Sequence, residues 1–382
     1  MTSPIRIAYL ASSMRNLGGA ERVNRAVLTR MDRECFAPRA IFLKNAGELG
    51  SQLPRQGVPV VELGLSHRKQ FLSGLMRLHR HLRQHPVEVL FTAEDKICMA
   101  TAALLRRLKT APRYVVCFHG TRTWRGYIGA IHAFAVRNAD RVITLSQRHK
   151  QFWQQHYRLS DEKITVIPNG IELEKYFPRS PIEKAALRLQ HGLQPDLLTV
   201  GLVAFFKDSK NLPGFVEVAK EVVACGVAAQ FVLVGDGPER ASLEKAIQQC
   251  QMEAYFHLPG ITQEPELWYA MFDMVLMTSL TEAFPLTVIE GMACGLPVVA
   301  TEVAGIPDIV AHGETGFLAL PTELDKLAQY VVQLARDAEL RQRMGEAGRL
   351  RALAEFDVKV MVERYAQMFR EVAGYSRENR YG

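Results

Sequence analysis

The sequence predicts an α/β protein with two parallel-sheet domains, and three observations support this prediction. The chain has 382 residues, more than a single hydrophobic core usually supports. Short apolar runs alternate with glycine turns and helical stretches in both halves, as in the repeated strand, turn and helix of a parallel sheet. Hydrophobic residues make up 48% and charged residues 23% of the chain, which is typical of a folded globular protein.

The strand ends of the first half carry small and polar residues. The first strand leads through Gly18 and Gly19 into a helix, and such a glycine pair lets the backbone approach a ligand or simply makes a tight turn. His119 follows a later strand at its carboxyl end, where open α/β sheets bind ligands, although an isolated histidine is more often a packing residue. Apolar runs predict strands of this half at 5–10, 38–43, 59–63, 87–92, 114–118 and 140–146.

Basic residues are concentrated in the same half. Residues 1–165 hold 27 Lys and Arg against 11 Asp and Glu, although the net charge of the whole chain is only +7. An anionic partner is therefore expected for this half, and without a recognisable nucleic-acid module that partner is an acidic acceptor or a membrane surface. The loop that carries Arg122, Arg125 and Tyr127 could hold an anionic acceptor.

Residues 66–86 predict an amphipathic basic helix. Leu75, Leu78 and Leu82 recur at helical spacing, and arginines take the other positions. Such a helix is either an ordinary surface helix packed on the sheet or a face that binds anionic headgroups. The basic residues of this possible membrane face are Arg68, Lys69, Arg77, Arg80 and Arg83, joined by Arg106, Arg107 and Lys109 of the next helix.

The sequence shows neither a signal peptide nor an apolar run of membrane-spanning length. We therefore expect a cytoplasmic protein, with peripheral attachment to the inner face of the cytoplasmic membrane as a further possibility. A turn signal at 168–170 marks the expected domain boundary. The predicted domains are 1–168 and 169–355, and the predicted strands of the second are 198–204, 230–234, 255–258, 274–277 and 297–300.

The most informative stretch is residues 278–301, which predicts a loop, a helix and the start of a strand. Glu282 lies in the loop and Glu290 in the helix, roughly 12 Å apart along the axis at about 1.5 Å per residue. Between them, helix N–H groups from about Leu286 onward have no intrahelical partner and can bind phosphate oxygens. The two glutamates would then accept hydrogen bonds from sugar hydroxyls, unless Glu282 merely caps the helix and Glu290 is a surface residue.

The stretch TEAFPLTVIEGMACGLPVVAT resembles the donor-site signature of retaining glycosyltransferases of family 4. GGAERV near the N-terminus and ITVIPNG at the boundary also resemble this family, so the resemblance covers nearly the whole chain. It implies a GT-B fold, in which two Rossmann-like domains face an interdomain cleft and a C-terminal helix, here 356–382, returns to the first domain. The implied activity is transfer of a hexose from a nucleotide sugar to a glycan, lipid-linked or cell-envelope acceptor, as in polysaccharide or lipopolysaccharide biosynthesis.

The resemblance also implies a role for each site residue. Glu282 would hold the transferred sugar, Lys210 the leaving diphosphate, and His119 would touch the sugar from the first domain. Glu290 would hold the ribose, and a UDP-sugar is expected in preference to a GDP-sugar as co-substrate, with no cofactor. The catalytic residues would be Glu282, His119 and Lys210, and the donor-binding residues Gly18, Gly19, Lys207, Lys210, Phe284, Pro285, Leu286, Thr287 and Glu290.

The sequence departs from the family pattern at Phe205, where the family usually has an arginine that neutralises the diphosphate. Lys207 could replace part of that charge, although lysine lacks the bidentate geometry of arginine. The chain contains no Asp-x-Asp motif, so we expect metal-independent transfer. A nucleotide-sugar-binding protein without turnover and a nucleotide-sugar epimerase stay open as alternatives.

Overall fold

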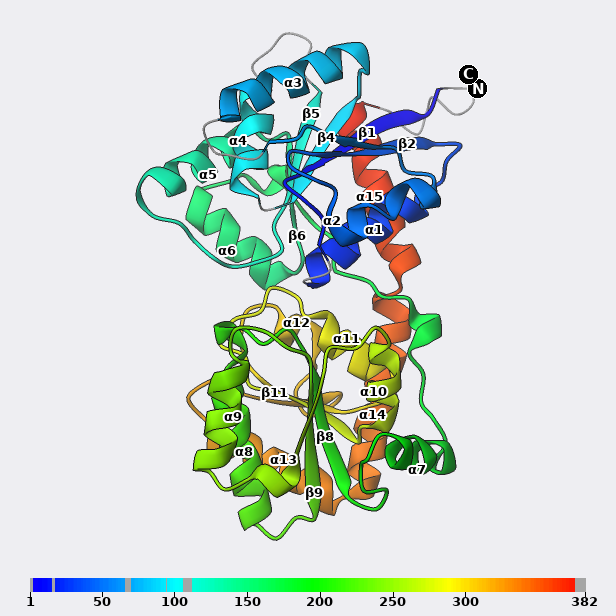
Figure 1. Ribbon diagram of the computed structural model, residues 1–382, viewed down its shortest axis with the longest axis vertical. Coiled ribbons are helices and arrows are strands. Elements are labelled where there is room, and N and C mark those ends of the chain that lie inside the picture. Colours follow the sequence, from blue (N-terminus) through cyan, green and yellow to red (C-terminus); the bar gives the residue numbers. More distant parts are fainter. Residues whose placement is uncertain (1–2, 16–17, 66–69, 94, 106–111, 375–382) are drawn as a thin grey trace. The chain divides into compact units, whose positions relative to one another are not determined.

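The computed structural model describes residues 3–15, 18–65, 70–93, 95–105 and 112–374 of the chain. The chain divides into two compact units, Met1–Asn169 with Val358–Gly382, and Gly170–Asp357. Each unit is built on one parallel sheet covered by helices (Figure 1). The predicted α/β architecture with two parallel sheets is therefore confirmed.

The sheet of the first unit has seven parallel strands. Most are short apolar runs that are buried on both faces, which is typical of parallel strands covered by helices. In spatial order they are β3 (Val60–Glu62), β2 (Phe36–Phe42), β1 (Ile5–Ala11), β4 (Val89–Ala93), β5 (Arg113–Cys117), β6 (Arg141–Thr144) and β7 (Ile164–Val166).

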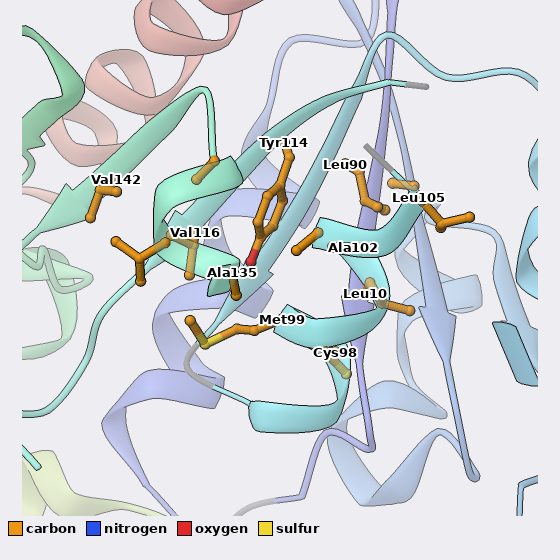
Figure 2. Close-up of a cluster of buried hydrophobic side chains, with 14 of the residues drawn as sticks. Leu10, Leu90, Cys98, Met99, Ala102, Leu105, Tyr114, Val116, Ala135 and Val142 are labelled. Atoms are coloured by element: carbon orange, nitrogen blue, oxygen red, sulfur yellow. The ribbon is translucent and has the colours of Figure 1, made fainter. Parts of the chain in front are cut away.

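The core of this unit forms where helices pack on the middle strands. Figure 2 shows Met99 and Ala102 of α4 beside Tyr114 of β5 and Leu90 of β4, all almost fully buried. None of the helices in the described residues is both long and apolar enough to span a membrane. The helices of this unit are α1 (Gly19–Arg30), α2 (Gly47–Gly50), α3 (Phe71–Gln84), α4 (Lys96–Leu105), α5 (Gly126–Asn138), α6 (Gln147–Tyr157) and α15 (Val358–Ala373).

The last helix, α15, belongs to the first unit although 188 residues of the second unit precede it. Its apolar face contacts β4: the Tyr365 and Phe369 rings lie 5.9 and 5.6 Å from the Phe91 ring, measured between centroids. The helix also packs beside α1 (Figure 1). The aromatic face of α15 therefore completes the core of the N-terminal sheet.

The second unit repeats the plan with six parallel strands. Helices α8 and α9 lie on one side of the sheet and α10, α11 and α14 on the other (Figure 1). In spatial order the strands are β10 (Phe256–Gly260), β9 (Ala229–Val234), β8 (Leu198–Val203), β11 (Met274–Met277), β12 (Val298–Thr301) and β13 (Gly316–Ala319). The helices are α7 (Pro181–Gln190), α8 (Leu212–Ala224), α9 (Arg240–Gln249), α10 (Pro265–Met271), α11 (Leu286–Ala293), α12 (Ile306–Ile309), α13 (Leu324–Arg336) and α14 (Ala338–Glu355).

Candidate active site

The loop between β11 and α11 is held by hydrogen bonds to the segments that follow the two adjacent strands. Thr278 Oγ1 donates to the carbonyl of Asn211, beyond β8, at 2.9 Å. On the other side, Thr301 Oγ1 at the end of β12 donates to the carbonyl of Ser279 at 2.5 Å. The loop is therefore fixed at the carboxyl edge of the sheet, which is where ligands bind to open α/β sheets.

Lys210 and Glu282 form an ion pair in this loop region. Lys210 Nζ lies 2.5 Å from Glu282 Oε1, and Ser279 Oγ donates to the same oxygen at 3.0 Å. Their side chains are only 9% and 10% exposed, and charges in such a position need partners. The structure thus brings together two residues, 72 positions apart, that were both predicted to bind the donor.

The start of α11 lies beside the end of β8, because Thr287 Oγ1 donates to the carbonyl of Val203 at 2.9 Å. The N-cap residue is Pro285, and no side chain of the described residues caps this end. The first N–H groups of a helix have no intrahelical partner, so the amides of Leu286 and Thr287 are available to an anion, whereas the Val288 N–H donates to the Pro285 carbonyl at 3.3 Å. The side chain of Phe284 packs on Phe356, with 5.6 Å between ring centroids, and its contact with the donor stays a prediction.

The other end of α11 is held by α14. A Cβ atom on Gly345 would lie 2.0 Å from the Gly295 carbonyl oxygen, so the close contact between α14 and the turn that follows α11 requires glycine. Arg349 Nη1 donates to the carbonyl of Ala293, and a cation stabilises the negative end of a helix dipole. The same nitrogen donates to the carbonyl of Tyr176 at 3.3 Å, which ties the 170–177 segment to α11.

Glu290 lies on α11 as predicted, but two tyrosines that sequence reasoning missed surround its carboxylate. The Tyr176 hydroxyl donates to Oε1 at 3.0 Å and the Tyr269 hydroxyl donates to Oε2 at 2.9 Å. The residue is 2% exposed, so Glu290 is not a solvated surface residue. Burial, and then the negative charge of Glu290, raise the pKa of Tyr269 well above its usual value, which keeps its hydroxyl protonated as a donor.

These bonds change what a ribose contact would require. Each carboxylate oxygen has about two acceptor positions, and one position on each oxygen is already taken by a tyrosine. A ribose would have to use the remaining positions or displace a tyrosine hydroxyl. The ribose assignment of Glu290 stays a prediction, and Tyr176 and Tyr269 are now part of it. No sequence signal could have found them, because they lie 114 and 21 positions from Glu290.

The segment after β8 packs tightly against a glycine loop. Gly235 and Gly237 have φ angles of 138° and 156°, in the region that favours glycine. A Cβ atom on Gly235 would lie 1.8 Å from the Ala204 carbonyl oxygen, and one on Gly237 would lie 2.3 Å from that of Phe206. The glycines of GDGP therefore allow two loops to touch, which is a packing role.

Phe205, at the position where an arginine was expected, has a side chain that is 42% exposed. Lys207, two residues further on, is also exposed and precedes the short 3-10 turn Asp208–Lys210. Its carbonyl accepts the N–H of Lys210 at 2.9 Å, so the two lysines are joined through the backbone. The turn therefore carries one lysine in the ion pair and one facing solvent.

In the first unit, His119 follows β5, and side chains of α6 contact the carbonyl of the next residue, Gly120. Leu145 N donates to His149 Nδ1 at 3.2 Å, and His149 Nε2 lies 2.8 Å from the Gly120 carbonyl oxygen and 2.7 Å from Trp153 Nε1. Trp153 Nε1 donates to the same carbonyl at 3.2 Å. Burial, and then the charge of His149, lower the pKa of His119 to about 4, so its imidazole is neutral at pH 7. Contact between His119 and the transferred sugar stays a prediction.

Gly18 and Gly19 lie at the start of α1, with Gly18 as the N-cap residue. Gly18 has a φ of −175°, an extended backbone that any residue can adopt. A Cβ atom there would meet only Glu21 Oε2, at 3.5 Å, which is an ordinary contact. Nothing in the local packing of the described residues therefore requires a glycine at position 18, which is compatible with the predicted approach of a ligand.

The residues predicted to bind an acceptor surround the start of α5. Arg122 lies over the ring of Trp124, with 4.1 Å from its Cζ to the ring centroid. Arg125 is the N-cap residue of α5, and its side chain is exposed. Tyr127 is 81% exposed. Of the three, only Arg122 belongs to a side-chain cluster within the described part of the chain.

The proposed membrane face is described only in part. Arg77, Arg80 and Arg83 are all exposed on α3, and Arg77 Nη1 also donates to the Leu63 carbonyl at 2.7 Å. Leu72 and Met76 of the same helix are 70% and 61% exposed. The remaining predicted residues, Arg68, Lys69, Arg106, Arg107 and Lys109, lie outside the described residues.

The two parallel-sheet units agree with the GT-B fold that the sequence resemblance implies. Two family models match: "Glycosyltransferase Family 4" over residues 17–175 and "Glycosyl transferases group 1" over residues 183–351. The chain belongs to the family 4 type of GT-B glycosyltransferases.

Individual proteins are similar to this chain in sequence or in fold. N-acetyl-alpha-D-glucosaminyl L-malate synthase of Bacillus anthracis is 28% identical over 63% of this chain, a match that spans only 61% of that protein. An uncharacterized glycosyltransferase of Haemophilus influenzae is 22% identical over 94% of this chain and 98% of its own length. A crystal structure of Anabaena Alr3699/HepE in complex with UDP has a TM-score of 0.84 at 21% identity, covering 96% of this chain and all of that chain.

Proposed function

We propose that the protein transfers a sugar from a UDP-sugar to an acceptor hydroxyl and that the anomeric configuration is retained. In this proposal Lys210 and the first amides of α11 hold the diphosphate, and Glu282 holds the transferred sugar. Glu290 accepts hydrogen bonds from the ribose. The acceptor is a glycan or lipid-linked sugar of the cell envelope that is bound by the first unit.

The observation that supports this proposal best is the Lys210–Glu282 pair beside the start of α11. A lysine and a helix N-terminus are the groups that stabilise negative charge on a leaving diphosphate. A buried carboxylate next to them is suited to accept hydrogen bonds from sugar hydroxyls. The solved relative that contains UDP shows that such a fold can hold this nucleotide, which supports a UDP-sugar as the donor.

The same charges support transfer without a metal ion. Lysine and helix amides would supply the stabilisation that a bound cation supplies elsewhere. We therefore expect the release of UDP from a panel of UDP-sugars to continue at nearly the same rate in excess EDTA. Loss of activity with EDTA and rescue by magnesium or manganese would contradict this part of the proposal.

A test of turnover also separates the alternatives. A transferase stabilised by its donor should release UDP and form a product whose anomeric configuration, measured by NMR, matches that of the donor. Thermal stabilisation by a UDP-sugar without any release of UDP would instead indicate a nucleotide-sugar-binding protein without turnover, which is the alternative suggested by Phe205 in place of an arginine. Conversion of one UDP-sugar into another would indicate an epimerase.

Lys207 should replace part of the charge that is missing at position 205. We expect Lys207→Ala to weaken UDP binding about tenfold, or about 1.4 kcal/mol, since a cation near a phosphate is lost. The Lys207→Ala/Lys210→Ala variant should lose less UDP binding free energy than the two single variants lose together, because both lysines would act on one diphosphate. Titration calorimetry measures both, with Lys220→Ala, an exposed lysine on α8, as the control. Unchanged affinity in Lys207→Ala would leave Phe205 without local compensation.

We also propose that the outer face of α3 attaches reversibly to anionic membranes. Exposed Leu72 and Met76 lie on the helix that carries exposed Arg80 and Arg83, a combination of apolar and basic groups found in interfacial helices. Each cation near an anionic bilayer contributes about 1 kcal/mol, and salt screens this attraction. Such attachment would bring the enzyme to a lipid-linked acceptor.

Liposome co-sedimentation tests this attachment. Wild type should sediment with vesicles that contain anionic lipid at low salt and less at high salt, and Arg80→Gln/Arg83→Gln should sediment less. Arg77 is left unchanged because it holds the Leu63 carbonyl. Arg137→Gln, at the end of α5, removes an exposed charge elsewhere in the same unit. Binding that does not depend on lipid charge, or a double variant that binds like wild type, would rule out membrane attachment through this face of α3.

A further inference from the structure

A second cluster of charged and aromatic side chains lies in the first unit, where β4 and β5 end. Lys96 Nζ is 3.2 Å from the centroid of the Trp124 ring, and Arg122 Cζ is 4.1 Å from the same centroid. Lys96 begins α4, directly after β4, and the other two residues lie in the loop between β5 and α5. Because β4 and β5 are paired neighbours, the cluster lies at the carboxyl edge of the sheet, where ligands bind.

Both cations of this cluster lie over the Trp124 ring, and neither forms an ion pair with an acidic side chain among the described residues. The neighbouring acid, Asp95, is occupied: its Oδ1 accepts the N–H groups of Ile97 and Cys98 at 2.9 and 3.0 Å, which caps α4. Two positive charges held on one indole ring repel each other, and an anion bound beside them would offset this repulsion. The arrangement therefore favours a negatively charged ligand.

His132 lies beneath the cluster and adds no further charge to it. Its ring centroid is 6.0 Å from that of Trp124, and it is fully buried. Burial, and then the charge of Lys96, lower the pKa of His132 to about 4, so the imidazole is neutral at pH 7. Neither of its ring nitrogens has a hydrogen-bond partner within the described part of the chain. The positive charge is thus confined to Lys96 and Arg122, at the surface.

We propose that Lys96, Arg122 and Trp124 bind the anionic group of the acceptor, and that this acceptor is a sugar acid or a sugar phosphate. The inference rests on the proposed function, since it names the acceptor class of that transferase. The two cations would bind the carboxylate or phosphate oxygens, and the accessible part of the indole would contact the sugar ring. The indole also holds both cations in place before the ligand arrives, which lowers the entropy cost of binding.

Titration calorimetry with four probes tests the proposal: glucuronic acid, glucose 1-phosphate, methyl glucoside and inorganic phosphate, at constant ionic strength, with and without UDP. Both anionic sugars should bind about tenfold or more tightly than methyl glucoside. Glucose 1-phosphate should also bind more tightly than inorganic phosphate, because only the sugar phosphate can contact Trp124. A methyl glucoside that binds equally well, or an inorganic phosphate that does, would overturn the proposal.

Variants locate the binding on this cluster. Lys96→Gln and Arg122→Gln should each weaken anionic-sugar binding about tenfold, while Lys96→Arg retains most of it. Arg137→Gln, on the same unit but at the far end of α5, should bind like wild type. Unchanged binding in both Gln variants would overturn the proposal. UDP binding without any preference for anionic sugars would count against this inference alone, whereas a failure of UDP to bind would count against the proposed function.

Discussion

Replacing Glu282 by glutamine should lower turnover about 100-fold while UDP affinity changes by less than about threefold. The carboxylate would accept charge-assisted hydrogen bonds from the transferred sugar, each worth about 1.5 to 3 kcal/mol, and UDP alone does not contain that sugar. Glutamine has nearly the same shape, and its amide oxygen can still accept hydrogen bonds from Ser279 and Lys210, so the loop should keep its conformation although the ion pair is lost. The measurement is a comparison of kcat with UDP affinity from calorimetry.

Two further variants separate chemistry from folding at this site. Glu314→Gln removes an exposed carboxylate from the same unit and should leave both quantities unchanged. Lys210→Gln alone leaves the buried carboxylate of Glu282 without a partner, and breaking a buried ion pair in this way lowers the free energy of unfolding by about 3 to 5 kcal/mol. The Lys210→Gln/Glu282→Gln variant leaves no charge unpaired. The double variant should therefore regain stability and stay inactive. An active double variant would show that the pair is only structural.

Replacing Glu290 by alanine should destabilise the second unit more than other changes at the site, except for breaking the Lys210–Glu282 pair. The substitution leaves the Tyr176 and Tyr269 hydroxyls buried without their acceptor, at about 1 to 3 kcal/mol for each. Tyr176→Phe and Tyr269→Phe each remove one bond and should cost less. Chemical denaturation of the three variants measures these free energies of unfolding. If Glu290→Ala is as stable as wild type, the tyrosine contacts contribute nothing.

Glutamine at position 290 tests the ribose contact without stranding the tyrosines. If Glu290 accepts a hydrogen bond from the ribose, wild type should bind UDP about tenfold more tightly than 2′-deoxy-UDP. Glu290→Gln should lose most of that preference, because an amide oxygen is a weaker acceptor than a carboxylate. Equal discrimination by wild type and variant would show that the carboxylate serves only Tyr176 and Tyr269.

The two sheets could be predicted because parallel strands that are buried on both faces are short apolar runs. The fully buried run Met274–Met277 and the strand Val298–Thr301 show this pattern clearly. The spacing of Glu282 and Glu290 placed one glutamate in a loop and the other on a helix, as the structure shows. Local sequence was sufficient here because each of these features depends on its immediate neighbours.

Side-chain partners distant in the sequence could not be predicted. The bond from Tyr176 to Glu290 joins residues 114 positions apart, and neither residue's surroundings in the sequence indicate it. Arg77 looked like one more basic residue of an amphipathic helix, but it reaches the carbonyl of Leu63 in the segment after β3. The Lys96–Trp124 contact likewise depends on β4 and β5 lying side by side. Such contacts are set by the tertiary fold and carry no periodic signal.

Titration calorimetry of UDP against wild type and Lys210→Gln tests the central claim, that the loop after β8 and the start of α11 form the nucleotide site. Circular dichroism would first establish that the variant is folded, and Lys220→Gln would serve as the charge-matched control. The account predicts that wild type and the control bind UDP equally, while Lys210→Gln binds about ten- to a hundredfold more weakly. Equal UDP affinity in wild type and a folded Lys210→Gln variant would contradict it.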